Sequence, residues 1–84
     1  MNSRKLLRKV LGGTKNLRFA ELCRLAEAFG YRLDRVNGSH HIYVNPAADR
    51  PLNVQNVHGQ AKPYQVRQLL RDVEAFNLRL GEDL

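Results

Sequence analysis

The sequence lacks the features that would place it in several protein classes. It has a single cysteine, Cys23, so no disulfide can form within the chain, and a thiol-reducing compartment, the cytoplasm, is expected. No apolar run approaches the roughly 18 residues of a membrane helix, and no apolar stretch of the secretory-signal type follows the basic start. The sequence also contains neither a glycine-rich phosphate loop nor a serine-hydrolase elbow. These absences favour a small cytoplasmic domain that has no membrane partner.

The charge of the chain indicates an anionic partner. Its 84 residues include 14 lysines and arginines against eight aspartates and glutamates, a formal net charge of +6. Nine of the basic residues and three of the acidic ones lie within residues 1–35. Such a region is typical of contact with nucleic acid or with an acidic protein, although solvated helix faces also carry charges of this kind. A chain of this length has room for one small domain with a modest core.

Three segments have the apolar spacing of helices. Residues 3–11 are expected to form a short helix that Ser3 caps. A second helix follows the candidate cap Asn16 and ends at Gly30, with its apolar side chains in one stripe. The third begins at Pro63, a residue favoured in the first helical position.

Between the second and third helices the apolar period changes to that of strands. Alternation predicts three short strands, at residues 31–36, 40–45 and 52–54. Asn37-Gly38 is a strong hairpin signal between the first two, and residues 58–60 form another turn. The order predicts an α+β fold: a small three-stranded antiparallel sheet with helices on one face. The other face is then open to solvent or to a ligand.

The candidates for chemistry are three histidines, His40, His41 and His58. His40 and His41 follow Gly38 and Ser39 at the exit of the predicted turn, where a glycine lets a ligand come close. With Arg35 nearby, this edge is suited to handling a phosphate. From the residues alone, the simpler interpretation is that both histidines occupy ordinary surface positions on a strand.

No metal and no other cofactor is expected. Adjacent residues of a strand point to opposite faces, so His40 and His41 do not easily share one metal ion. His58 has no cysteine, histidine or carboxylate at the spacing of a zinc motif.

The run Gly38-Ser39-His40-His41-Ile42-Tyr43 resembles the signature of the HicA-family toxins of bacterial toxin–antitoxin systems. Its surroundings resemble the family too, with FGY at residues 29–31 and Lys62-Pro63 opening the last helix. The resemblance covers roughly residues 19–73. It predicts one HicA-like domain over residues 1–84, made of a helical extension at 1–16, a core at 17–76 and a tail at 77–84.

The resemblance also implies a fold and an activity. The family is similar to double-stranded-RNA-binding domains, with the order α-β-β-β-α, to which this chain adds an N-terminal helix. Its members are endoribonucleases that cleave mRNA and are held inactive by a HicB-type antitoxin. One histidine of the motif is catalytic in the family, and here it is His40 or His41.

Two arguments about these histidines disagree. The position directly after Gly-Ser favours His40. Strand alternation instead places His40 with Ile42 on the core face and His41 with Tyr43 on the exposed face. Alternation is least reliable beside a glycine turn, where a bulge shifts the register, so both residues remain candidates.

RNA would be cleaved without a metal if an imidazole took the proton of the 2′-hydroxyl, which then attacks the adjacent phosphate. Basic side chains would stabilise the charge on that phosphate. The residues expected to contact RNA are Gly38, Ser39, Arg32, Arg35, Tyr43 and Lys62.

Two further hypotheses belong to other classes, and one strand departs from the family pattern. The domain could bind duplex RNA without cutting it, as a non-catalytic module of double-stranded-RNA-binding type. It could also be a docking module for an acidic antitoxin.

Many family members carry a Val-Pro-Arg-His-like run on the third strand, whereas residues 54–58 are VQNVH here, which leaves the role of His58 open.

Overall fold

The structure is a computed structural model that describes residues 2–81. Met1 of the predicted extension and residues 82–84 of the predicted tail lie outside the described residues. In chain order the elements are α1 (Ser3–Leu11), α2 (Phe19–Ala28), β1 (Arg32–Asn37), β2 (His40–Val44), β3 (Leu52–Val57), β4 (Gln60–Ala61) and α3 (Pro63–Ala75). None of these helices is long and apolar enough to cross a membrane.

The α+β prediction is confirmed, with one correction to the number of strands. The sheet has four antiparallel strands in the order β1-β2-β3-β4, not three. The turn predicted at residues 58–60 returns the chain as β4, because His58 and Gly59 both adopt positive φ angles, 52° and 82°. Two such residues in succession are typical of a type I′ hairpin. A strand of two residues has no alternation, so the sequence pattern did not predict it.

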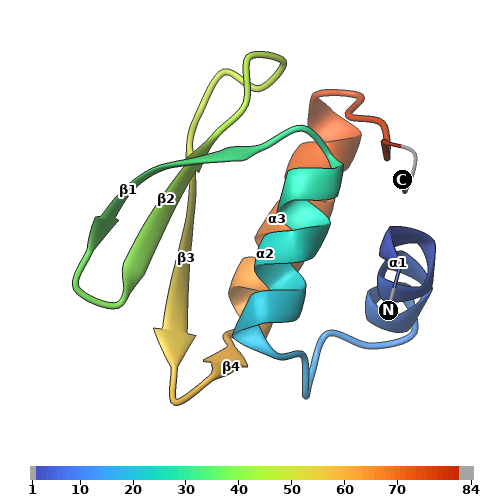
Figure 1. The fold of residues 1–84 in the computed structure, drawn as a ribbon. Coiled ribbons are helices and arrows are strands. Elements are labelled where there is room, and N and C mark those ends of the chain that lie inside the picture. The colour runs from blue at the N-terminus through green and yellow to red at the C-terminus, as the bar shows by residue number, and fades with distance from the viewer. Residues whose placement is uncertain (1, 82–84) are drawn as a thin grey trace.

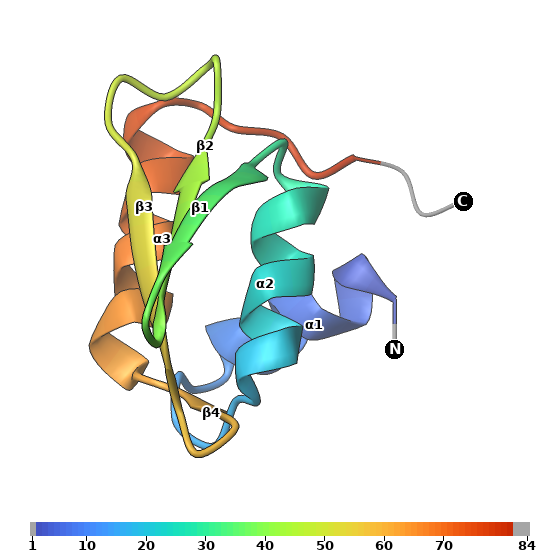
Figure 2. The ribbon, with the colours of Figure 1, turned by 60° about the vertical axis from the view of Figure 1, so that its left-hand side comes forward.

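The elements form three layers. The sheet lies on one side, α2 and α3 lie together against one of its faces, and α1 packs on the outer side of the helices (Figure 1). A second view shows the same arrangement, with β1 at the free edge of the sheet (Figure 2). From α2 onward the order is that of a double-stranded-RNA-binding domain, with the short β4 added. The sheet therefore keeps one face free of helices.

The helices begin close to the predicted positions, but with different caps. Asn2 rather than Ser3 caps α1, and its side-chain oxygen accepts a hydrogen bond from the Lys5 amide at 2.9 Å. Asn16 does not cap α2, because its φ of 63° places it in a turn two residues earlier. Arg18 takes the cap position instead, and its amide donates to the Glu21 carboxylate at 3.0 Å. That hydrogen bond lowers the pKa of Glu21.

The β1–β2 hairpin places the histidines. Asn37 pairs with His40, so the turn consists of Gly38-Ser39 rather than the predicted Asn37-Gly38. Gly38 has a φ of 62°, a conformation that glycine adopts without the penalty of a Cβ atom. A bulge between Leu33 and Arg35 shifts the register of β1 by one residue. The bulge brings Arg35 beside Ile42, on the face that the helices leave free.

The core lies between the sheet and the helices. Its fully buried side chains come from every layer: Leu6, Val10, Leu17, Leu22, Leu25, Leu52, Val54, Val66 and Leu69. The stripe on α2 and the stripe on α3 both face it, as predicted. Cys23 packs against this core, and burial raises the pKa of its thiol. A protonated, partly buried thiol is suited to packing rather than to nucleophilic chemistry.

Asn45 shows why alternation assigned the strand faces wrongly. This residue looks like a surface residue in the sequence, yet it is only 7% exposed. Its amide nitrogen donates to the Phe29 carbonyl at 2.9 Å, and its oxygen accepts from the Ala47 amide at 3.0 Å. A buried polar group with both bonds made is not destabilising. Gly30 leaves room for it, because a Cβ there would meet the Asn45 amide nitrogen at 3.3 Å.

Candidate active site

His40 and His41 project from opposite faces of the sheet. His41 pairs with Val54, and Tyr43 pairs with Leu52. Tyr43, Leu52 and Val54 are all buried in the core, so His41 lies on the face that the helices cover. His40 therefore lies on the open face. The assignment of faces made from alternation is wrong, because Tyr43 is 3% exposed and belongs to the core.

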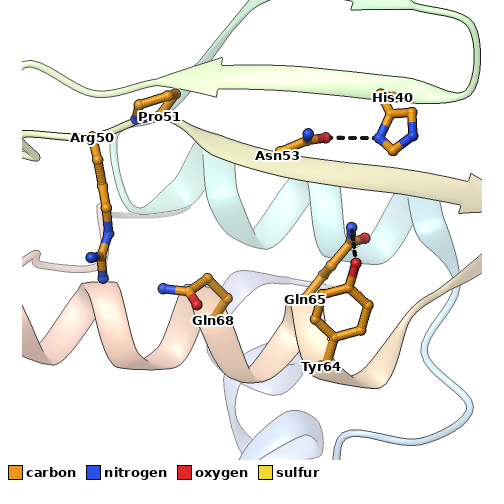
Figure 3. A pocket seen from close by; sticks show the side chains of 7 residues that line it. All are labelled: His40, Arg50, Pro51, Asn53, Tyr64, Gln65 and Gln68. Carbon is orange, nitrogen blue, oxygen red and sulfur yellow. Dashed lines mark hydrogen bonds between the residues drawn. The ribbon is translucent and has the colours of Figure 1, made fainter.

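The imidazole of His40 is held by a neighbour on β3. Its Nδ1 lies 3.1 Å from Oδ1 of Asn53 (Figure 3). The strand register places these two residues diagonally on the open face, because His40 pairs with Gln55 and Asn53 pairs with Ile42. An amide oxygen only accepts hydrogen bonds, so this contact requires the proton on Nδ1, and in the neutral ring the lone pair is then on Nε2. An imidazole in this state can accept a proton at Nε2.

His40 borders an open hollow of about 360 Å³. The hollow lies between the open face of the sheet and the side of α3 (Figure 3). The residues that line it are His40, Arg50, Pro51, Asn53, Tyr64, Gln65 and Gln68. Most of these side chains are polar, and they come from β2, from β3 and the loop before it, and from the first two turns of α3. The hollow is thus a tertiary feature, built by segments that are distant in the sequence.

An ion pair fixes the end of the hollow at Arg50. Its Nε and Nη2 donate to Oδ1 of Asp72, at 3.2 and 2.5 Å. Asp72 has no exposed surface, and its Oδ1 also accepts from Gln68. The hydrogen bond to Asp72 raises the pKa of the Arg50 guanidinium. The ring of Phe76 lies 5.5 Å below the guanidinium, which is therefore held in place while the side chain is 54% exposed.

The first turn of α3 fixes the other end. Gln65 is buried, and its Oε1 accepts a hydrogen bond from the backbone amide of Gln55 at 2.7 Å. Gln55 lies on the part of the β3 edge with which β4 does not pair. Nε2 of Gln65 donates to the Tyr64 hydroxyl at 3.2 Å. Tyr64 itself is 53% exposed, and Nζ of Lys62 lies 5.8 Å from the centre of its ring. An exposed aromatic ring with a held hydroxyl thus lines the hollow near His40.

His41 and His58 have different surroundings. The ring of His41 lies edge-on to Phe19, with the ring centres 4.7 Å apart, and its Nδ1 lies 3.3 Å from the Ser39 carbonyl. His58 sits in the β3–β4 turn and borders a separate hollow of about 370 Å³ beside Arg18. The three histidines therefore occupy three separate places. Within residues 2–81, no three histidine, cysteine or carboxylate side chains are grouped as metal ligands would be.

The residues predicted to contact RNA are divided among these places. Gly38 and Ser39 form the exposed turn, and the Ser39 hydroxyl accepts from Gln55 at 3.1 Å. The pairs Arg32–Val44 and Arg35–Ile42 put both arginines on the open face with His40. Arg35 is also 2.8 Å from Asp34.

The last two predicted contacts differ in how accessible they are. Lys62 is half-buried at the start of α3, above the Tyr64 ring. Tyr43 lies in the core, and burial raises the pKa of its hydroxyl. A surface contact between Tyr43 and RNA is not available in this structure.

Comparison with known proteins decides the family. The family model of the HicA toxin of bacterial toxin–antitoxin systems matches residues 19–75, which is more than half of the chain. The chain belongs to the HicA toxin family. No curated protein and no solved structure matches it significantly. As a HicA toxin it is one half of a toxin–antitoxin system, so an antitoxin is its partner.

The HicA match coincides with particular elements of the fold. It begins at Phe19, the first residue of α2, and ends at Ala75, the last residue of α3. The sheet, both motif histidines and the hollow all lie within it. Helix α1 precedes it, attached through Leu6 and Val10 in the core and through the Lys9–Glu21 ion pair at 3.2 Å. The HicA motif and the hollow are thus parts of the same matched region.

Sequence reasoning did not find several residues of the hollow. Asn53 could have been found from the antiparallel register, because it follows once the turn and the β2–β3 pairing are known. Arg50, Tyr64, Gln65 and Gln68 carried no such signal. They lie between 10 and 28 residues from His40 along the chain, and only the docking of α3 on β3 brings them together.

Proposed function

We propose that this HicA toxin is a metal-independent endoribonuclease that cleaves mRNA, with His40 as its general base, and that a HicB-type antitoxin inhibits it. One observation carries the proposal. The motif histidine His40 borders an open hollow, and its Nδ1 is within hydrogen-bond distance of Oδ1 of Asn53. His41 is less suited to this role, because it packs against Phe19 on the helix-covered face.

The proposed reaction uses the nucleophile that RNA carries. Nε2 of His40 takes the proton of a 2′-hydroxyl, and the oxygen attacks the adjacent phosphorus. The bond from phosphorus to the 5′-oxygen breaks, that oxygen takes up a proton from water as it leaves, and His40 returns its proton to the solvent. The products are a 2′,3′-cyclic phosphate and a 5′-hydroxyl end. A positioned base contributes about 10²- to 10⁴-fold to such a step.

Two basic side chains lie on the same face of the sheet as His40, and a third lines the other end of the hollow. Arg32 and Arg35 extend from β1 on the face that carries His40, and Arg50 lies across the hollow. Positive groups held in place stabilise the charge that develops on a phosphate in the transition state. The same positive face suits an acidic antitoxin surface, which would block access to His40 when it binds.

Cleavage in a chelator tests the proposal as a whole. Purified toxin is expected to cut a single-stranded RNA in EDTA as fast as in magnesium, and to leave 2′,3′-cyclic phosphate ends. End-group analysis of the fragments by mass spectrometry identifies those ends. Activity that disappears in EDTA and returns with magnesium would contradict the proposed mechanism. RNA that is bound but never cut would instead favour the non-catalytic RNA-binding module.

A change at Asn53 tests the state of the imidazole. In Asn53→Asp a carboxylate still accepts from Nδ1, but its negative charge favours the protonated ring. We expect the midpoint of the rise in cleavage rate with pH to move upward. The rate near neutral pH falls, because a larger fraction of the base is already protonated. It recovers in more alkaline solution.

A matched variant controls for the added charge. Asn56 is also on β3, but its Oδ1 accepts from the Gly59 amide at 2.7 Å, at the other hollow. Asn56→Asp adds the same charge to the same strand away from His40. Its pH profile is expected to match that of the unmodified toxin. An unchanged midpoint in Asn53→Asp, measured at saturating RNA, would show that Asn53 does not hold the reacting imidazole.

A further inference from the structure

We infer that the hollow between β3 and α3 is a binding site for unpaired RNA, in which a base stacks on Tyr64 and a neighbouring phosphate contacts Arg50. The inference rests on the proposed function for the position of the cleaved phosphate, at His40. It adds the place in the fold where an unpaired stretch of that RNA is bound. It also assigns a binding role to two residues outside the motif.

Tyr64 has the properties of a stacking platform. Its ring is 53% exposed although it sits in the first turn of a helix that packs on the core. Gln65 donates a hydrogen bond to the Tyr64 hydroxyl at 3.2 Å. The Gln65 side chain is itself held by a hydrogen bond from the Gln55 amide. The ring is thus oriented before a ligand arrives. Aromatic rings that are held in this way bind the faces of successive bases in single-stranded nucleic acid.

Arg50 has the properties of a phosphate contact. Asp72 takes donors from Nε and Nη2, whereas neither of these bonds uses Nη1. The side chain remains 54% exposed at the far end of the hollow from Tyr64 (Figure 3). A planar guanidinium whose orientation is already fixed loses little freedom on binding a phosphate oxygen. Asp72, which is buried with no exposed surface, therefore acts as a positioning residue for Arg50.

The order of these groups favours an unpaired strand. Tyr64, Gln68 and Asp72 follow one another at intervals of four residues, so they lie along one side of α3. An RNA strand that lies along α3 would pass His40 and Tyr64 at one end of the hollow and Arg50 at the other end. Bases within a duplex are stacked on each other and cannot offer a face to Tyr64. The fold resembles a duplex-binding domain, but this hollow requires a base that is free of its neighbours.

Binding to the inactive toxin tests the stacking contact. In the His40→Ala background, fluorescence anisotropy measures the affinity for fluorescein-labelled oligouridine and for its duplex with oligoadenine. Tighter binding of the single strand is expected. Adding Tyr64→Ala should weaken that binding by about 5- to 150-fold, whereas Tyr64→Phe, which keeps the ring, should restore most of the affinity.

The salt dependence of binding tests the phosphate contact. The double variant Arg50→Gln/Asp72→Asn removes both charges of the pair, so the net charge stays the same and no buried carboxylate is left unpaired. Loss of one phosphate contact should reduce the slope of log affinity against log salt by about 0.7. Lys9→Gln/Glu21→Gln removes another ion pair, away from the hollow, and should leave the slope unchanged.

The outcomes separate this inference from the proposed function. Equal affinity of Tyr64→Ala and its parent, or tighter binding of the duplex, would overturn the binding site even if the toxin cleaves RNA in EDTA. Tyr64-dependent binding of the single strand would support the site even if the unmodified toxin never cleaves RNA. Circular dichroism confirms that each variant is folded. Because Tyr64 is half exposed, its replacement should leave the fold intact.

Discussion

His40→Ala is expected to lower the rate of RNA cleavage by about 10²- to 10⁴-fold, the contribution of a positioned general base. The variant should fold normally, because His40 lies on the open face and is only partly buried. Its expression should no longer stop the growth of cells that lack the antitoxin. Cleavage of a labelled RNA by purified protein, under single-turnover conditions, measures the loss directly.

His41→Ala is the matched comparison, since it removes the same side chain from the next position. His41 contacts Phe19 and the Ser39 carbonyl on the helix-covered face. We expect its loss to lower stability while the folded protein still cleaves RNA within a few-fold of the original rate. The opposite result, cleavage lost in folded His41→Ala and kept in His40→Ala, would transfer the catalytic role to His41.

Leu69→Ala is expected to lower the free energy of unfolding by about 2–5 kcal/mol, the range for a fully buried leucine that leaves a cavity. Leu69 has no exposed surface and lies in the stripe by which α3 joins the core. A domain of this length has a total stability of about 4–13 kcal/mol. The Leu69 side chain thus accounts for a large fraction of the free energy of unfolding. Urea denaturation followed by circular dichroism measures the change.

Leu11→Ala provides the control for this prediction. It is the same substitution at a leucine that is 67% exposed at the end of α1, and it should change stability by no more than about 0.5 kcal/mol. A similar loss in both variants would mean that burial in this structure does not govern stability. The comparison also bears on genetic selections for loss of toxicity. Cells that carry a core substitution such as Leu69→Ala should survive such a selection, because the toxin is destabilised although His40 is unchanged.

The local pattern of the sequence was sufficient for every element of this fold except the two-residue β4. Apolar spacing of 3.6 residues predicted the two helices that cover the sheet, and Pro63 marked the start of α3. The change to a period of two predicted β1, β2 and β3, and a glycine turn joined the first two. These signals are local, because each depends on residues within a few positions of one another. For the same reason the motif of residues 38–43 indicated the HicA family without any knowledge of the fold.

Local pattern was not sufficient to decide which face of the sheet is buried. Alternation shows that Tyr43 and His41 share a face, but it does not show which face the helices cover. Polarity misled the assignment, because the Tyr43 ring packs in the core and Asn45 can be buried once its polar atoms find partners within the fold. The face of His40 became clear only when the pairing of β2 with β3 and the position of the helices were known.

The surroundings of His40 depend entirely on tertiary structure. Asn53 reaches the imidazole through strand pairing, and Tyr64 and Arg50 reach the hollow because α3 docks on the free edge of β3. That docking uses the Gln65 side chain, and the buried Asp72 holds Arg50 of the loop before β3; neither residue belongs to an apolar pattern. The sequence alone therefore established the helices, three of the four strands, the positive charge and the family motif, which all follow from neighbouring residues. The hollow and the choice between the two histidines follow from long-range packing, which no short stretch of the chain encodes.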